Sequence, residues 1–161
     1  MLRDLTMDDA PSVQRVYSGA SVRFTTGEAL TAAKARAKVA NILVHARAVP
    51  REHWCFGVIV ADDLIGLAKF RCRTRSTASI NYVLRDDMWG NGYATEAVRR
   101  LARFAFAVPG LDRLTARHHP ENPASGRVLA KSGFVCTGCD DDDYVTYELR
   151  QPSRPRRQGR T

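Results

Sequence analysis

Two glycines separated by a single residue stand in the stretch WGNGYAT, residues 89–95. The alternation typical of a strand ends at Leu84, and a helical pattern begins at about Gly92. Because glycine has no Cβ, the backbone there can turn tightly and approach a ligand closely. The first N–H groups of a helix have no partner within it and lie at its positive end, which attracts phosphate. The stretch therefore predicts a phosphate site, with a plain tight turn as the alternative.

A second motif follows about thirty residues later (NPAS, residues 122–125). It continues as RVL (127–129) and KSGF (131–134). The first motif is neither a P-loop nor a complete dinucleotide fingerprint, because no Lys-Ser/Thr pair and no third glycine follow. The two motifs together resemble the signatures of the GNAT acetyltransferase superfamily, in particular its RimJ/RimL-like branch. The superfamily signature is Arg/Gln-x-x-Gly-x-Gly/Ala, and Trp89 replaces its first residue, as is usual in that branch.

The resemblance covers roughly residues 80–138 and implies acetyl-CoA as the cofactor. In similar proteins one strand runs beside the pantetheine arm, and the glycine loop binds the pyrophosphate through main-chain N–H groups. The cofactor-binding residues implied here are Tyr82, Val83, Leu84, Trp89, Gly90, Asn91, Gly92, Tyr93, Ala94, Thr95, Asn122 and Ser125. The reaction implied is direct transfer of an acetyl group to a primary amine.

The catalytic candidates are Ser125, Asn122 and His119. Ser125 matches a serine near the cofactor sulfur in this branch, and a structural first-turn serine is the alternative. Asn122 matches a cofactor-contacting residue and could equally cap the short helix that begins at Pro123. Leu129 stands where many members carry a tyrosine acid, so Ser125 or a water molecule would have to assist the leaving thiolate.

No general base is secure in the sequence. His118 and His119 follow a strand next to the expected cleft, and a histidine pKa near 6.5 suits a base. A surface pair of histidines is the alternative. Ser79 replaces an acid that is frequent in this branch, which favours a base acting through water. The acceptor side could be lined by Glu52, His53 and Tyr144.

Two acceptors remain open within this reading: a protein N-terminus and a small amine. A peptide needs an open groove, whereas a small cation favours an acidic pocket. The run DDDD, residues 140–143, could attract a cation, with a solvated loop as the alternative. A CoA-binding regulatory domain with weak catalysis is the competing function.

Together with the order of the predicted elements, the resemblance implies an α/β fold with a mixed, mainly antiparallel sheet of six to seven strands, about four helices and a splayed central cleft. Helices are expected from near residue 8, over about 28–47, from about 92 to 108 and from 123 to 131. The strands expected are 54–60, 64–72, 78–84, 113–118, 134–137 and 144–149. The unit around the glycine loop should be a parallel strand–helix–strand crossover.

The chain has 161 residues, a length that suits one domain, and a formal net charge of +8. We expect an acetyltransferase domain over residues 1–149 and a disordered tail over 150–161, which holds five arginines and no acid. Nucleic-acid binding by the tail is a minor alternative, and a homodimer is conceivable. No signal or membrane-spanning segment is evident, so we expect a cytoplasmic protein. Cys136 and Cys139 form a CxxC without a second ligand pair, so no metal site is expected.

Overall fold

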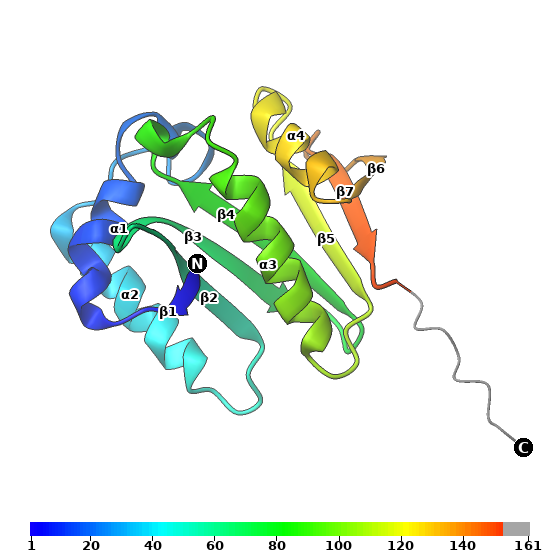
Figure 1. Cartoon of the computed structure of the whole chain (residues 1–161), viewed down its shortest axis with the longest axis horizontal. Helices are drawn as coiled ribbons and strands as arrows, with labels where there is room; N and C mark the ends of the chain where they lie inside the picture. The colour runs from blue at the N-terminus through cyan, green and yellow to red at the C-terminus, as the bar shows by residue number, and fades with distance from the viewer. Residues whose placement is uncertain (153–161) are drawn as a thin grey trace, which may run out of the picture.

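A computed structural model describes residues 1–152 and shows a seven-stranded sheet in the order β1-β2-β3-β4-β5-β7-β6. Figure 1 shows the sheet with helices on both faces. The strands are β1 (Leu2–Asp4), β2 (His53–Val60), β3 (Asp63–Cys72), β4 (Thr77–Leu84), β5 (Arg113–His118), β6 (Val135–Cys139) and β7 (Val145–Arg150). All neighbouring strands are antiparallel except β4 and β5. The mixed, mainly antiparallel sheet predicted from the sequence is confirmed.

The helices divide between the two faces of the sheet. α3 (Tyr93–Ala107) and α4 (Pro123–Lys131) cover one face, and α1 (Ala10–Val16) and α2 (Ala32–Ala46) cover the other. Short 3₁₀ turns at Met7–Asp9, Gly19–Phe24 and Asp86–Met88 complete the pattern. Within residues 1–152, no helix has both the length and the apolar character needed to cross a membrane.

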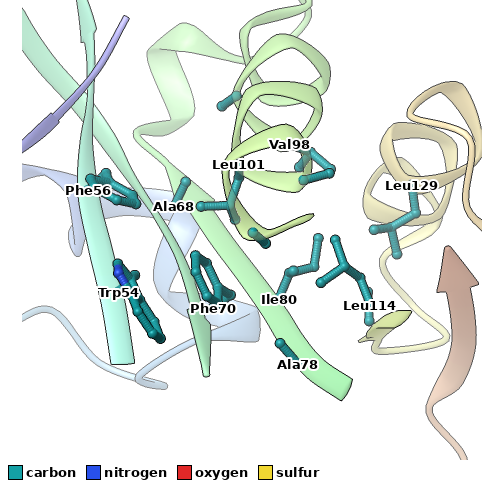
Figure 2. Close-up of a cluster of buried hydrophobic side chains, with 14 of the residues drawn as sticks. Trp54, Phe56, Ala68, Phe70, Ala78, Ile80, Val98, Leu101, Leu114 and Leu129 are labelled. Carbon is teal, nitrogen blue, oxygen red and sulfur yellow. The ribbon is translucent and has the colours of Figure 1, made fainter. Parts of the chain in front are cut away.

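The apolar stripe of α3 explains where the main core lies. Val98 and Leu101 repeat at helical spacing and are fully buried. Figure 2 shows both side chains pointing toward Ile80 of β4, with Leu114 of β5 and Leu129 of α4 beside them. This packing holds α3 across the middle of the sheet and α4 above β5, so the beginnings of both helices are fixed relative to the strands.

The sheet opens between β4 and β5. Only residues 77–79 of β4 pair with β5, at Arg113, Leu114 and Thr115. From Ile80 and Ala116 onward the two strands have no pairing, and Figure 1 shows them diverging. The parallel crossover and the splayed cleft predicted from the sequence are therefore present.

Some element boundaries differ from the prediction. α2 begins at Ala32 rather than near residue 28, because Thr31 caps it by accepting a hydrogen bond from the Lys34 N–H at 3.2 Å. Strand β1 was not predicted, since three residues are too few for a periodicity. The predicted tail lies outside the described residues beyond 152, and its first residue, Arg150, ends β7.

Candidate active site

The N-terminus of α3 presents a set of unused backbone donors. No acceptor within residues 1–152 is recorded for the backbone N–H groups of residues 90–95, whereas Glu96 N–H already bonds Gly92 O at 3.1 Å. Asn91 and Gly92 are exposed. These groups add to the positive end of a 15-residue helix. An anion with several oxygens, such as a diphosphate, fits this arrangement.

The two glycines of this loop have backbone angles that favour glycine. Gly90 and Gly92 have φ of +78° and +79°, and Gly92 is the N-cap residue of α3. A Cβ built on either would meet no atom within 4 Å. The glycines are therefore required for the left-handed turn, and the space in front of them is open to a ligand.

One side chain ties the loop to the end of β4, and a second bonds to carbonyl groups within the loop. Trp89 Nε1 donates to Leu84 O at 3.1 Å, and Asn91 Nδ2 donates to Met88 O and Trp89 O at 3.3 and 3.1 Å. Both contacts are made by residues that the sequence analysis assigned to the cofactor. Their side chains shape the loop, so any contact with an anion falls to the main chain.

One edge of β4 faces the opening between β4 and β5. Arg85 N–H donates to Ile65 O on β3 at 2.8 Å, and backbone groups alternate in direction along a strand. The N–H and C=O groups of Ile80, Tyr82 and Leu84 therefore point away from β3, toward the opening. The backbone of Val83 points to β3 instead, and its side chain is buried under α1 and α2. Of the three predicted strand contacts, Tyr82 and Leu84 have the suitable orientation.

A pair of hydroxyl groups lies between β4 and the first turn of α4. Tyr82 Oη is 2.7 Å from Ser125 Oγ and 3.0 Å from the Ser125 carbonyl oxygen. Burial raises the pKa of Tyr82 to about 12, against a smaller lowering by its hydrogen bond with Ser125. The phenol therefore keeps its proton at neutral pH and acts as a hydrogen-bond donor.

The beginning of α4 positions Ser125. Asn122 Oδ1 accepts a hydrogen bond from Ser125 N–H at 3.3 Å, which is an N-cap contact, and Pro123 is the first helical residue. The capping role considered for Asn122 is present. Its Oδ1 is occupied by this bond, and its Nδ2 makes no recorded bond within the described residues.

The two histidines have different surroundings. His118 is buried, its Nδ1 lies 2.7 Å from His119 O, and its Nε2 faces Gly126 of α4. His119 is half-buried between the rings of Phe24 and Tyr144, and its Nδ1 accepts from the Glu121 N–H at 3.2 Å. In the neutral ring this bond places the proton on Nε2. His118 Nδ1 must donate to the carbonyl oxygen, so in its neutral ring Nε2 carries the lone pair, and no bond to this nitrogen is recorded within the described residues. His118 Nε2 is thus an unengaged acceptor but is buried against α4, whereas the acceptor nitrogen of His119 is engaged.

A hollow of about 870 Å³ lies where the opening meets the α2 side of the sheet. Residues on both sides of the opening line it, among them Asn81 of β4, Ala116 of β5 and Tyr147 of β7. His53, predicted for the acceptor side, lines the hollow, whereas Glu52 and Tyr144 do not. The hollow is the natural place for an acceptor, because it reaches the opening from the face opposite α3 and α4.

Sequence reasoning did not identify the Tyr82 hydroxyl, only its backbone. The contact with Ser125 depends on how α4 packs against the sheet, which the sequence pattern does not specify. The fit of α4 against β5 and β7 was also missed: a Cβ at Gly126 would lie 2.6 Å from His118 Nε2 and 3.0 Å from Tyr147 Oη.

This open, mixed sheet, with a bare helix N-terminus beside two diverging strands, defines the fold class of CoA-dependent acyltransferases. A family model described as "Acetyltransferase (GNAT) domain" matches residues 1–135, so the chain belongs to the GNAT acetyltransferase family. The resemblance found in the sequence is thereby confirmed.

Among curated relatives, N-acetyltransferase p20 of Bacillus licheniformis is 35% identical over 87 residues, which is 52% of this chain and 49% of that protein. The ribosomal-protein-serine acetyltransferase of Escherichia coli is 28% identical over 101 residues, 62% of this chain and 55% of that protein. The match spans about half the length of these relatives.

The solved structures of similar fold include RimL, a ribosomal L7/L12 α-N-protein acetyltransferase in complex with coenzyme A. Its TM-score is 0.80, its identity 15%, and the match covers 92% of both chains. The aminoglycoside acetyltransferase AAC(6')-Ib in complex with coenzyme A has a TM-score of 0.78 and 18% identity over 94% of both chains. At these identities the likeness confirms the fold and leaves the acceptor open.

Proposed function

We propose that the protein is an acetyl-CoA-dependent N-acetyltransferase that moves an acetyl group directly to a primary amine. The observation that carries the proposal is the row of unused N–H groups over residues 90–95, which begins α3 beside the unpaired edge of β4. Family membership and the neighbours solved with coenzyme A support the choice of cofactor.

The chain's own residues have three tasks in this reaction. Backbone N–H groups of Asn91, Gly92, Tyr93, Ala94 and Thr95 bind the diphosphate. The free edge of β4 aligns the pantetheine arm, and the N–H of Tyr82 or Leu84 serves as the donor to the acetyl oxygen. When bound, acetyl-CoA supplies a thioester whose carbonyl carbon accepts the amine.

The Tyr82–Ser125 pair assists the leaving sulfur. Tyr82 Oη has one proton and two acceptors within reach, the Ser125 carbonyl oxygen at 3.0 Å and Ser125 Oγ at 2.7 Å. In the arrangement that we propose for the reaction, this proton goes to Ser125 Oγ, and the serine O–H is then free to donate to the leaving sulfur. A coenzyme thiol with a pKa near 8.5 needs only modest stabilisation, so a hydrogen bond suffices and full proton transfer is not required. Asn122 keeps Ser125 in place through the helix cap.

The amine must lose a proton, because a primary amine is mostly charged at neutral pH. We propose that this proton leaves through water in the hollow. His119 is the alternative acceptor, and it would first have to give up its bond from Glu121 N–H. Holding amine and thioester together provides most of the acceleration, with effective molarities of roughly 10⁵ M or more.

The test is a thiol-release assay with acetyl-CoA over a panel of peptides with free N-termini and small amines. Release of free thiol with matching acetylated product supports the proposal. If no thiol is released, coenzyme A binding measured by calorimetry distinguishes a protein that binds the cofactor without turnover from one that does not bind it. Binding without turnover on any amine favours a CoA-binding regulatory domain. The presence of Leu129, where many family members carry a catalytic tyrosine, supports that alternative. Absence of binding would overturn both functions.

A further inference from the structure

The hollow that we assign to the acceptor is lined by basic side chains. Five of them come from three segments of the fold: Lys38 of α2; Lys69, Arg71 and Arg73 in and just after β3; and Arg117 of β5. Among the lining residues the single acid is Glu148. Lys69 and Arg71 are two residues apart in one strand, so their side chains share a face about 7 Å apart.

The acid in the hollow is already used by other residues. Glu148 Oε1 accepts from Arg150 Nε at 2.7 Å, and its Oε2 lies 3.5 Å from Arg113. Arg117 pairs outward with Asp140 at 2.7 Å. Within residues 1–152, no carboxylate lies within ion-pair distance of the other four basic residues: Lys38, Lys69, Arg71 and Arg73. The hollow thus has a surplus of positive charge.

Part of this charge is held away from bulk water. Lys38 is half-buried, and its Nζ lies 4.6 Å from the centre of the Tyr17 ring. Burial lowers the pKa of Lys38, and the nearby Lys69 lowers it further. Keeping two ammonium groups close together in a hollow has a cost, which an anionic ligand would remove.

The basic surface extends beyond the first hollow. A second hollow of about 870 Å³ shares Trp54, Arg71 and Arg73 with it and adds Arg51 and Arg75, against the one acid Glu52. Basic side chains therefore continue from the hollow beside Asn81 to the turn that follows β3. Positive charge spread over this many positions suits a ligand with several carboxylates along a chain better than one with a single charge.

We propose that the acceptor is the N-terminus of a polypeptide whose first few residues carry carboxylates. This inference rests on the proposed function and names its substrate class. The free amine reaches the opening near Asn81, and the following Asp or Glu side chains lie along Lys69, Arg71 and Arg73. The same cations favour the neutral, attacking form of the amine, which reduces the need for a placed general base.

A small cationic acceptor does not suit this surface, because like charges repel across the hollow. The acidic run at 140–143 does not change this. Asp140 is bound to Arg117 and accepts from the N–H groups of Asp142 and Tyr144.

The experiment compares three hexapeptides with a free N-terminal serine, in which positions two to five are acidic, amide or lysine residues. We expect the acidic peptide to have the highest kcat/KM and to lose its advantage as salt rises. In the variant Lys69→Gln/Arg71→Gln, KM for the acidic peptide should rise roughly three- to fivefold for each charge removed, with kcat for that peptide nearly unchanged. Arg103→Gln, an exposed charge on α3, is the matched control and should leave KM as it is.

Equal kcat/KM for the acidic and amide peptides, or a preference for the lysine peptide or kanamycin, would overturn the inference. Acetylation of free glutamate without acetylation of the peptides would overturn the choice of a polypeptide. Binding of the acidic peptide to the CoA-loaded protein is measured as well, by fluorescence anisotropy. If thiol release fails with every amine while this binding persists and needs Lys69 and Arg71, the proposed function fails and the peptide site stands. If the binding is equal for the acidic and amide peptides, the peptide site fails.

Discussion

Tyr82 Oη lies 2.7 Å from Ser125 Oγ, so a residue of β4 and a residue of α4 meet beside the opening between β4 and β5. The family position that often holds a tyrosine acid is Leu129 here, and it is fully buried. In the mechanism that we propose, Tyr82 of β4 supplies the hydroxyl that α4 lacks at this position. Because burial raises the pKa of Tyr82 to about 12, the phenol keeps its proton and can orient the serine hydroxyl over the whole physiological pH range.

The first prediction removes this hydroxyl. Tyr82→Phe should lower kcat about ten- to hundredfold, which corresponds to one hydrogen bond to a charged group. Ser125→Ala should have a similar effect, and the double variant should be little worse than either, because the two groups act as a unit. The KM for acetyl-CoA should change less than kcat.

The control is Tyr144→Phe, which removes a phenol hydroxyl that makes no recorded bond within the described residues and does not line the hollow. It should leave kcat within a few-fold of the parent. Wild-type kcat in Tyr82→Phe would contradict the assignment, provided that its thermal midpoint shows a folded protein.

The second prediction concerns the glycine loop. Gly92→Val should weaken coenzyme A binding by more than about tenfold, because the side chain enters the open space before the N–H groups and the left-handed turn resists it. Calorimetric titration with coenzyme A measures the effect.

Gly27→Val is the matched control, since Gly27 has a φ of +77° and equally open surroundings in the loop before α2. Both variants should lose a comparable amount of stability, about 1 kcal/mol or more. Only Gly92→Val should lose affinity for coenzyme A. An equal loss of affinity in both variants would contradict the assignment of the phosphate site to the N-terminus of α3.

The sequence predicted the fold well because its signals are local. The apolar stripe of α3 and the Asn122-Pro123 cap each depend on neighbours within a few residues, and the structure contains both. The glycine loop was found for the same reason. By contrast, the Tyr82–Ser125 contact joins residues 43 apart in the chain, and the basic hollow gathers residues from α2, β3 and β5. Such long-range contacts depend on how helices and strands pack together, and the periodicity of the sequence does not predict this packing.

The third prediction concerns acid stability. Asp9 is buried, receives hydrogen bonds from Arg3 at 2.7 and 2.8 Å, and accepts one from Thr6 N–H at 2.8 Å. The hydrogen bonds from Arg3 hold the pKa of the Asp9 carboxyl below its usual value, against the opposing effect of burial. A lowered folded-state pKa means that this stability is present above about pH 4 and is lost as pH falls through the folded-state pKa.

Asp9→Asn should therefore cost about 1–3 kcal/mol of unfolding free energy at pH 7, and this cost should be smaller at pH 3, where part of the charge-dependent stability is already lost. Urea denaturation at the two pH values measures the difference. Asp8→Asn, at the neighbouring position in the same 3₁₀ turn, is the control and should cost little at either pH. A deficit for Asp9→Asn that is equal at both pH values would show that shape rather than charge matters at this position.

The last prediction tests how closely α4 must approach the sheet. Gly126 is buried, and an added Cβ would fall 2.6 Å from His118 Nε2 and 3.0 Å from Tyr147 Oη. Gly126→Ala should cost about 1–3 kcal/mol of stability through overpacking, despite the better helix propensity of alanine. Because Ser125 precedes this residue, the outward shift of α4 should also lengthen the Tyr82–Ser125 contact and lower kcat.

The double variant Gly126→Ala/His118→Ala removes the imidazole ring that the added methyl group would meet. It should recover part of the lost stability and part of the lost kcat, as thermal denaturation and the thiol-release assay would show. If Gly126→Ala alone were as stable and active as the parent, α4 would have room to move, and the fixed position of Ser125 on which the mechanism depends would be lost.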